Sequence, residues 1–152
     1  NWRSRRYCVS DVAIAGPTAK FGIPETTLGV IPAQIAPFVV ERIGLTQARR
    51  LALLGLRVDG QEALSLGIVH QAAGSDEELE NMLGHALERV RQCAPHATAE
   101  TKALLLRVGH EEMGGLLDRA AGKFADAIRG DEGSEGTKAF MQKRPPAWAE
   151  PD

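Results

Sequence analysis

The order of the hydrophobic patterns limits the fold of this chain more than any other feature. Alternating β-branched residues over residues 7–15 predict a strand that ends near Gly16, and residues 19–23 predict a second short strand. From residue 37 onward the apolar residues follow helical spacing almost throughout. Two or three short strands do not make a stable sheet on their own. We therefore expect them to need pairing partners from residues that precede this sequence or from another chain.

Glycines and capping residues divide the helical part of the chain. Gly44 ends a first predicted helix, and Gly55 ends a second one that begins at Thr46. Capping boxes at residues 59–62 and 75–78 predict the next two helix starts. Turns with at most short helical pieces are predicted for residues 22–37, and later helices for residues 98–108, 111–129 and from 131 or 134 to 143, with a loose tail after residue 146.

The composition is that of a globular domain and argues against several kinds of partner. The 152 residues are 43% hydrophobic and 25% charged with a net charge of −2, so a nucleic-acid partner is not indicated. No apolar run approaches the roughly 20 residues of a membrane span. Residues 1–6 lead into no apolar segment of the signal-peptide type. Cys8 and Cys93 lack the spacing of a redox or zinc motif, and we expect a reduced, cytoplasmic protein.

The histidines and glycine pairs do not form a recognisable catalytic motif. The four histidines have no metal-ligand spacing on one helix face, so we interpret them as surface or structural residues and expect no metal site. The sequence contains neither a Gly-x-Ser-x-Gly run nor a P-loop. Gly114 and Gly115 lie inside a helical pattern and indicate close helix packing rather than phosphate binding.

One carboxylate, Glu25, has apolar neighbours on both sides. It ends the run Phe-Gly-Ile-Pro-Glu at residues 21–25, and Leu28-Gly29 and Ile31-Pro32 follow. Burial disfavours the charged form of a carboxyl group, which suits a group that exchanges protons near neutral pH. The alternative is a glutamate at a helix start, stabilised by the helix dipole. Taken alone, the Pro-Glu pair favours this second interpretation.

Several segments in a fixed order resemble the enoyl-CoA hydratase/isomerase (crotonase) superfamily. In chain order they are SDVAIA (10–15), AKFGIPE (19–25), LGVIP (28–32), GLRVDGQEALSLGIV (55–69), TKALL (101–105) and EGTKAFMQKRP (135–145). The resemblance covers about residues 7–148. Agreement of several segments is more specific than any single motif.

The resemblance implies a fold in two parts. Residues 7–70 would be the C-terminal part of an α/β crotonase core, a remnant of its ββα superhelix that carries the Pro-Glu active-site loop. Residues 71–148 would be a mostly helical oligomerisation region that forms a homotrimer or a dimer of trimers. Residues 1–6 remain unassigned.

The resemblance also implies an activity and a set of site residues. The protein would be an enoyl-CoA hydratase-type lyase of fatty acid metabolism that adds water to a 2-enoyl-CoA thioester. Its substrate would be an acyl-CoA, with no cofactor other than this coenzyme A moiety. Glu25 would be the general acid and base, and substrate contacts would come from Pro24, Leu28, Gly29, Pro32, Ala33, Phe140 and Lys143. Phe140 and Lys143 would approach coenzyme A bound to a neighbouring subunit, although Lys143 is equally typical of an exposed helix end.

The sequence departs from the family pattern at two places. A first glutamate would fall at Arg5 and an oxyanion-hole glycine near Trp2, so we expect the chain to hold half of a complete site. Residues 32–37 read PAQIAP where most hydratases carry Pro-Gly-x-Gly-Gly-Thr. This variant is similar to methylglutaconyl- and isohexenylglutaconyl-CoA hydratases and favours branched or carboxylated acyl chains.

Two other functions remain open at this stage. A single carboxylate also suits an enoyl-CoA isomerase, a dehydratase or a thioester hydrolase, and one fold hosts many reactions. A non-catalytic oligomerisation module is the other possibility, because the apolar helix faces suit a subunit interface.

Overall fold

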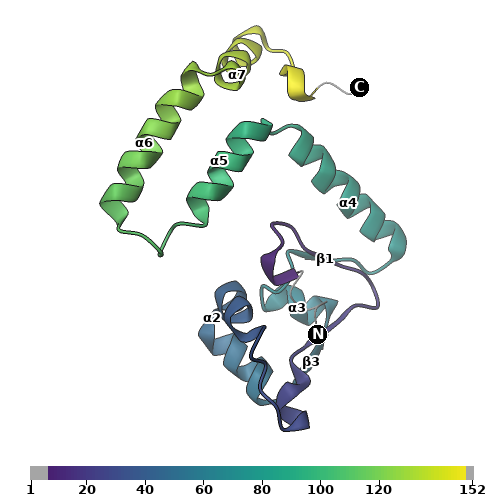
Figure 1. The fold of residues 1–152 in the computed structure, drawn as a ribbon. Coiled ribbons are helices and arrows are strands. Elements are labelled where there is room, and N and C mark those ends of the chain that lie inside the picture. The colour runs from purple at the N-terminus through teal and green to yellow at the C-terminus, as the bar shows by residue number, and fades with distance from the viewer. Residues whose placement is uncertain (1–6, 150–152) are drawn as a thin grey trace. The chain divides into compact units, whose positions relative to one another are not determined.

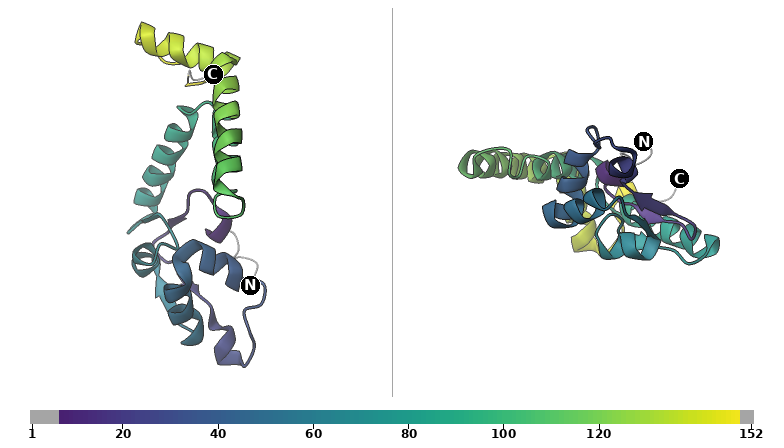
Figure 2. Two further views of the ribbon diagram at one scale, coloured as in Figure 1. Left: turned by 90° about the vertical axis from the view of Figure 1, so that its left-hand side faces the viewer. Right: turned by 90° about the horizontal axis from the view of Figure 1, so that it is seen from below.

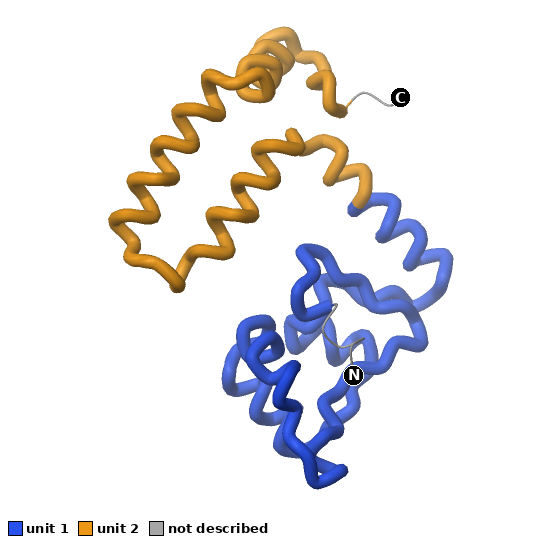
Figure 3. The backbone as a smooth tube through the Cα atoms, viewed as in Figure 1, with its two compact units in different colours: residues 1–86 blue, residues 87–152 orange. Residues whose placement is uncertain are grey.

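The computed structural model describes residues 7–149, and these divide into two compact units (Figure 3). Unit 1 ends at Ala86, and unit 2 begins at Leu87. Within the described residues every strand lies in unit 1, whereas unit 2 is helical (Figures 1 and 2). The division into domains at residues 70 and 71 stays a prediction.

Unit 1 contains two pairs of very short strands. β1 (Ile14–Ala15) pairs in parallel with β4 (Gln71–Ala72). β2 (Lys20–Gly22) pairs antiparallel with β3 (Arg57–Asp59). The predicted second strand is confirmed as β2.

The predicted strand over residues 7–15 is wrong in its first part. Residues 7–9 are helical, and only the last two residues of the range form a strand. The Tyr7 ring packs edge-on against Phe21, with 5.0 Å between the ring centroids. This contact between distant residues outweighs the local preference of the β-branched residues for a strand.

A turn and a kinked helix connect β2 to β3. η1 (Pro24–Leu28) is a short 3-10 helix with proline in its first turn. α2 (Ala36–Leu53) changes direction at Gly44, where φ is 74° and ψ is 161°. The predicted turn region and the predicted helix end at Gly44 are therefore confirmed.

Both predicted capping boxes start helices. Asp59 Oδ1 accepts a hydrogen bond of 2.9 Å from the Glu62 N–H at the start of α3 (Gly60–Ser65). Ser75 Oγ accepts one of 3.1 Å from the Glu78 N–H at the start of α4 (Asp76–Arg91). These bonds satisfy amides that would otherwise lack a partner in the first helical turn.

Three helices and a short 3-10 turn make up the rest of unit 2. They are α5 (Pro95–Leu105), α6 (Met113–Arg129), α7 (Asp131–Gln142) and η2 (Ala147–Ala149). α5 begins three residues before its predicted start, because proline suits the first helical position. The Glu132 carboxylate caps α5 by accepting hydrogen bonds from the His96 and Ala97 N–H groups at 2.8 and 3.0 Å.

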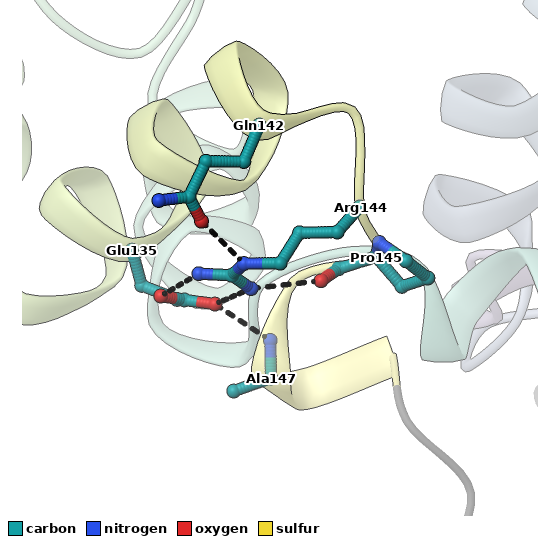
Figure 4. Close-up of polar contacts among 5 residues, drawn as sticks. All are labelled: Glu135, Gln142, Arg144, Pro145 and Ala147. Atoms are coloured by element: carbon teal, nitrogen blue, oxygen red, sulfur yellow. Dashed lines mark hydrogen bonds and ion pairs between the residues drawn. The ribbon is translucent and has the colours of Figure 1, made fainter.

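The segment after α7 is held in place, so the prediction of a loose tail is wrong for residues 147–149. The Arg144 guanidinium donates to both carboxylate oxygens of Glu135, at 2.6 and 2.9 Å (Figure 4). Glu135 also accepts a hydrogen bond of 3.0 Å from the Ala147 N–H. The Trp148 indole N–H donates to the Gln92 carbonyl at 3.2 Å. These partners are 9 to 56 residues apart in the sequence, beyond the reach of local patterns.

The buried core of unit 1 collects side chains from its strands and helices. Its members are Ala13, Ala15, Phe21, Ile23, Ile35, Val39, Ala48, Leu51, Val58, Ala63, Ile68, Val69 and Ala72. The core includes Phe21 of β2 and Ile23, the residue directly before η1. Within residues 7–149, no helix combines the length and the apolar character that crossing a membrane requires.

Candidate active site

Glu25 lies in the first turn of η1, directly after Pro24. Ile23, the residue before this turn, is buried in the core. The Glu25 side chain is half-buried, and its Oε2 atom is shut off from solvent without a hydrogen-bond partner among the described residues. A buried polar atom without a partner is costly. Such an atom is therefore a candidate for binding or proton transfer.

Hydrogen bonds from flanking residues hold the turn that carries Glu25. Thr26 Oγ1 donates to the Ala52 carbonyl at 2.8 Å, and Thr27 Oγ1 donates to the Pro24 carbonyl at 2.7 Å. The Val30 N–H donates to the Glu25 carbonyl at 3.1 Å. The backbone on both sides of the carboxylate is thus fixed by its neighbours.

Gly22 lets this turn start close to the neighbouring strand. A Cβ atom on Gly22 would lie only 2.6 Å from the Leu56 carbonyl oxygen, which is too close for any larger residue. The glycine in the run at residues 21–25 therefore has a packing role beside the strand pair β2–β3.

Apolar residues after Glu25 face solvent. Leu28 is 73% exposed and Ile31 is 77% exposed, and Gly29 and Ala33 are exposed as well. Pro32 is half-buried, and its carbonyl accepts hydrogen bonds from the Ile35 and Ala36 N–H groups just before and at the start of α2. An exposed apolar stretch beside an unpartnered carboxylate is a suitable surface for an acyl chain.

The structure brings only part of the predicted site together. Pro24, Glu25, Leu28 and Gly29 belong to η1 and its C-terminal cap, and Pro32 and Ala33 follow in the loop to α2. Phe140 and Lys143 lie in unit 2, near the end of α7. Phe140 is 86% exposed, and Lys143 caps α7 in the left-handed conformation with φ of 53°. The positions predicted to correspond to the first glutamate and the oxyanion glycine, Arg5 and Trp2, lie outside the described residues.

Sequence reasoning missed a structural cluster around Arg42. Arg42 Nε donates to the carbonyls of Gly67 and Ile68, both at 3.2 Å, and Nη1 donates to the Ser10 carbonyl at 3.2 Å. His70 Nδ1 accepts a hydrogen bond of 3.0 Å from the Ala13 N–H. These contacts tie the residues before β1 to those before β4, so the structural interpretation of His70 is confirmed.

The Arg42 cluster also affects the half-buried thiol of Cys8. Burial raises the pKa of Cys8, and the nearby positive charge of Arg42 opposes this increase. A cavity of about 10 Å³ beside Cys8, Phe21 and Arg42 is too small for a substrate. No three His, Cys, Asp or Glu side chains in the described part of the chain are grouped so as to hold a metal ion.

The Gly114–Gly115 pair has a role that the sequence analysis did not predict. Both N–H groups donate to the Glu112 carboxylate, at 2.7 and 2.8 Å, at the start of α6. A Cβ atom on Gly114 would lie 3.1 Å from Glu112 Oε2. The pair thus accommodates a carboxylate cap.

Comparisons with known proteins agree with the resemblance described above. Residues 7–151 match the family model for enoyl-CoA hydratase/isomerase. The crystal structure of an enoyl-CoA hydratase/isomerase from Marinobacter aquaeolei is 80% identical, with a TM-score of 0.92 over 95% of this chain and 55% of that one. The crotonase-like fold is therefore confirmed, and the oligomerisation role of the C-terminal helices stays a prediction.

Two relatives are named for particular acyl groups. The 2,3-dehydroadipyl-CoA hydratase of Escherichia coli (strain K12) is 31% identical over 143 residues, which are 90% of this chain and 53% of that protein. The mitochondrial methylglutaconyl-CoA hydratase of Mus musculus is 28% identical over 142 residues, which are 91% of this chain and 45% of that protein. The chain thus spans about half the length of the curated relatives it matches. On the strength of the family model and these relatives, the chain belongs to the enoyl-CoA hydratase/isomerase family.

Proposed function

We propose that this protein is an enoyl-CoA hydratase in which Glu25 transfers the protons. The observation that carries the proposal is the Glu25 Oε2 atom, which is shut off from solvent and lacks a hydrogen-bond partner among the described residues. The family membership supports the reaction class, because the relatives named above include hydratases. An unpartnered carboxylate oxygen is available to accept a proton from a bound water or substrate.

The proposed reaction needs one carboxylate that first accepts and then donates a proton. The Glu25 carboxylate takes a proton from water while the water oxygen bonds to the β carbon of the enoyl thioester. The electron pair of the double bond moves toward the thioester carbonyl and forms an enolate, which backbone N–H groups would stabilise. The protonated Glu25 then gives its proton to the α carbon, so that one water molecule has been added in total.

Residues around Glu25 would contact the acyl chain. In this proposal Pro24, Leu28, Gly29, Pro32 and Ala33 line the acyl site. The exposure of Leu28, Gly29 and Ala33 supports such contact. Phe140 and Lys143 would approach coenzyme A bound to a neighbouring subunit, where the lysine charge suits the phosphates. No cofactor beyond the coenzyme A moiety is part of the proposal, and the cytoplasm is its proposed location.

A branched or carboxylated acyl chain is the proposed substrate class. Residues 32–37 depart from the run that most hydratases carry there and are similar to the corresponding run of methylglutaconyl- and isohexenylglutaconyl-CoA hydratases. Dehydroadipyl and methylglutaconyl groups, after which two relatives are named, both carry a second carboxylate. Comparing kcat/KM for crotonyl-CoA and for methylglutaconyl-CoA tests this preference. A higher value for crotonyl-CoA contradicts it.

Substitution of Glu25 tests the proposed role directly. In Glu25→Gln, the side chain keeps its size but loses the ability to take up a proton, and we expect kcat for crotonyl-CoA to fall by about 10²- to 10⁴-fold. Turnover is followed by the loss of ultraviolet absorbance of the conjugated thioester. Glu41→Gln, at an exposed position of α2, is the matched control and should keep its activity. Unchanged turnover in Glu25→Gln would contradict the proposed role of Glu25.

Isomerase chemistry is a second candidate, favoured by the buried Glu25 oxygen that lacks a hydrogen-bond partner among the described residues. A glutamate can take a proton from the α carbon of a 3-enoyl-CoA and return it to the γ carbon without adding water. Mass spectrometry of the products formed in ¹⁸O-labelled water separates the two reactions. Hydration incorporates the label and increases the product mass, whereas isomerisation leaves the mass of the substrate unchanged.

For unit 2 we propose assembly into a homotrimer or a dimer of trimers. Exposed apolar residues on α6 support this part of the proposal, because large exposed patches are typical of interaction sites. If the unchanged protein showed no turnover of any enoyl-CoA tested, assembly without catalysis would be the remaining function. Sedimentation velocity measures the mass in solution, and a monomer at micromolar concentration contradicts the assembly.

A further inference from the structure

We propose that Thr26 and Thr27 are positioning residues that hold the Glu25 carboxylate in place. They do so through an anchor between η1 and the end of α2, formed by Thr26, Thr27, Ala52 and Gly55. This inference rests on the proposed proton-transfer role of Glu25. It goes further by assigning the residues that fix where the carboxylate lies.

The first contact of the anchor joins η1 to the last turn of α2. Thr26 Oγ1 donates a hydrogen bond of 2.8 Å to the Ala52 carbonyl, 26 residues away in the sequence. This carbonyl also accepts from the Gly55 N–H at 3.3 Å, so the end of α2 and the turn share one acceptor. Because Thr26 directly follows Glu25, any rotation of η1 that moves the carboxylate stretches this bond.

The second contact closes the turn around Glu25. Thr27 Oγ1 donates a hydrogen bond of 2.7 Å to the carbonyl of Pro24, the residue before Glu25. The Thr27 methyl group points at Gly55, where an added Cβ atom would lie only 2.4 Å from Thr27 Cγ2. Gly55 also has a φ of 57°, which glycine adopts without strain. The end of α2 therefore approaches the turn closely, and only glycine permits this approach.

The anchor explains how a carboxylate without its own partner can be held. Glu25 Oε2 makes no hydrogen bond within the described residues that could fix its position. The backbone on both sides of Glu25 is fixed by threonine hydroxyls instead. A displacement of about 1 Å in a catalytic group can lower the rate by about 100-fold. A rigid turn therefore has a direct effect on turnover.

The hydroxyl of Thr26 can be removed without changing the size of the side chain. We expect Thr26→Val to lower kcat by about 10- to 100-fold and to leave KM unchanged, because the substrate contacts remain. Thr26→Ser keeps the hydroxyl and should restore the activity. Thr46→Val, at an exposed position of α2, is the matched control. Wild-type kcat in Thr26→Val, or a loss in Thr26→Ser equal to that in Thr26→Val, overturns the proposal.

The short distance between Gly55 and the Thr27 methyl group gives a second test, in which a second substitution should restore lost activity. Gly55→Ala should push the Thr27 methyl group and the turn away, which lowers kcat. Adding Thr27→Ser removes that methyl group while keeping the hydroxyl bond to Pro24, and it should restore part of the lost kcat. A double variant no more active than Gly55→Ala overturns the proposed contact. Circular dichroism of both variants excludes loss of folding as the cause of the rescue.

The outcomes separate this inference from the proposed function. If Glu25→Gln keeps its turnover, the proposed function fails and the positioning role fails with it. If Glu25→Gln stops turnover and Thr26→Val does not lower kcat, only the positioning role fails. Amide hydrogen exchange at Val30, whose N–H donates to the Glu25 carbonyl, adds a readout besides activity. Exchange at Val30 that is no faster in Thr26→Val than in the unchanged protein contradicts the anchor.

Discussion

Unit 1 and unit 2 differ in where they place their apolar side chains. In unit 1 most of the buried residues belong to one core, which takes side chains from the four strands and from α2 and α3. Among the described residues of unit 2, only Leu116 and Ala139 are buried hydrophobic residues, while Phe124 and Ile128 on α6 are more than half exposed. Burial of apolar surface is the main source of folding free energy. Unit 1 therefore has a buried core of its own, whereas the described helices of unit 2 bury few apolar side chains among themselves.

Unit 2 uses carboxylates as local stabilisers of its helices. The His96 and Ala97 N–H groups lower the pKa of Glu132, and the Gly114 and Gly115 N–H groups lower the pKa of Glu112. Each of these carboxylates accepts hydrogen bonds at a helix start, where the helix dipole favours negative charge. Unit 1 also has a carboxylate cap, at Asp59, so the contrast between the two units lies in the size of their buried cores.

The largest effect is expected from a cavity in the core of unit 1. Leu51 is 3% exposed, and Leu51→Ala should lower the free energy of unfolding by about 2–5 kcal/mol. Leu53→Ala, on the same helix at a position that is 66% exposed, should change it by less than about 0.5 kcal/mol. Urea denaturation followed by circular dichroism measures both values. If both variants lost the same free energy of unfolding, the prediction that α2 has one buried and one exposed face would be wrong.

The next effect concerns the apolar face of unit 2. Phe124 is 68% exposed, so a stable monomer should not depend on it. If another subunit covers this face, Phe124→Asp loses about 1.5–3 kcal/mol of burial, which weakens assembly by about 10- to 100-fold. Phe124→Leu keeps an apolar side chain and is the matched control. Sedimentation equilibrium over a concentration series measures the dissociation constant of the assembly. A value for Phe124→Asp equal to that of the unchanged protein contradicts the idea that another subunit covers Phe124.

A smaller effect is expected from a helix cap in unit 1. Asp59 Oδ1 accepts the Glu62 N–H at 2.9 Å at the start of α3. Asp59→Ala should therefore cost about 1 kcal/mol of unfolding free energy, because the first turn loses its acceptor. Asp59→Asn supplies an equivalent oxygen and should be nearly neutral. Urea denaturation measures the free energy of unfolding of both variants. A larger loss of this free energy in Asp59→Asn than in Asp59→Ala would contradict a capping role.

The smallest effect is a response of unit 2 to acid. Hydrogen bonds from the Arg144 side chain, and then from the Ala147 N–H, lower the pKa of Glu135 to about 2. A lowered pKa in the folded state means that the stabilisation is full above the ordinary value of 4.5 and is lost as pH falls toward 2. The contacts are partly exposed, so salt screening keeps the effect small.

The indole N–H signal of Trp148 reports this acid response. Trp148 donates to the Gln92 carbonyl next to the segment that Glu135 holds, so its chemical shift should change between pH 4.5 and 2. In Glu135→Gln the signal should already be shifted at neutral pH and should show no further change over this range. An identical acid response in Glu135→Gln would assign the transition to another group.

Local signals accounted for the elements that the sequence predicted well. The capping residues Asp59 and Ser75 form the expected hydrogen bonds within three residues. Gly44 interrupts its helix because its backbone takes a positive φ that other residues avoid. Each of these features depends on residues that are close in the chain, so a pattern in the sequence contains the cause.

Features that depend on distant partners were missed. The helical residues beside Tyr7 were predicted as a strand, because the contact with Phe21 leaves no trace in the local pattern. The role of Thr26 was missed for the same reason, since its acceptor Ala52 lies 26 residues away. The role of Glu25 was predicted from the resemblance to the family, since its apolar surroundings alone favoured a glutamate at a helix start. That its Oε2 atom is buried without a partner could be seen only once the chain was folded.

The sequence by itself determined the family and the two helix starts with capping boxes, and it pointed to Glu25 as the candidate carboxylate, because those follow from short runs of neighbouring residues. The tertiary structure alone decided how η1 is anchored to α2, which apolar faces are buried, and which charges pair at the end of α7. Those depend on atoms that folding brings together from far along the chain, and their free energy appears only when both partners are in place.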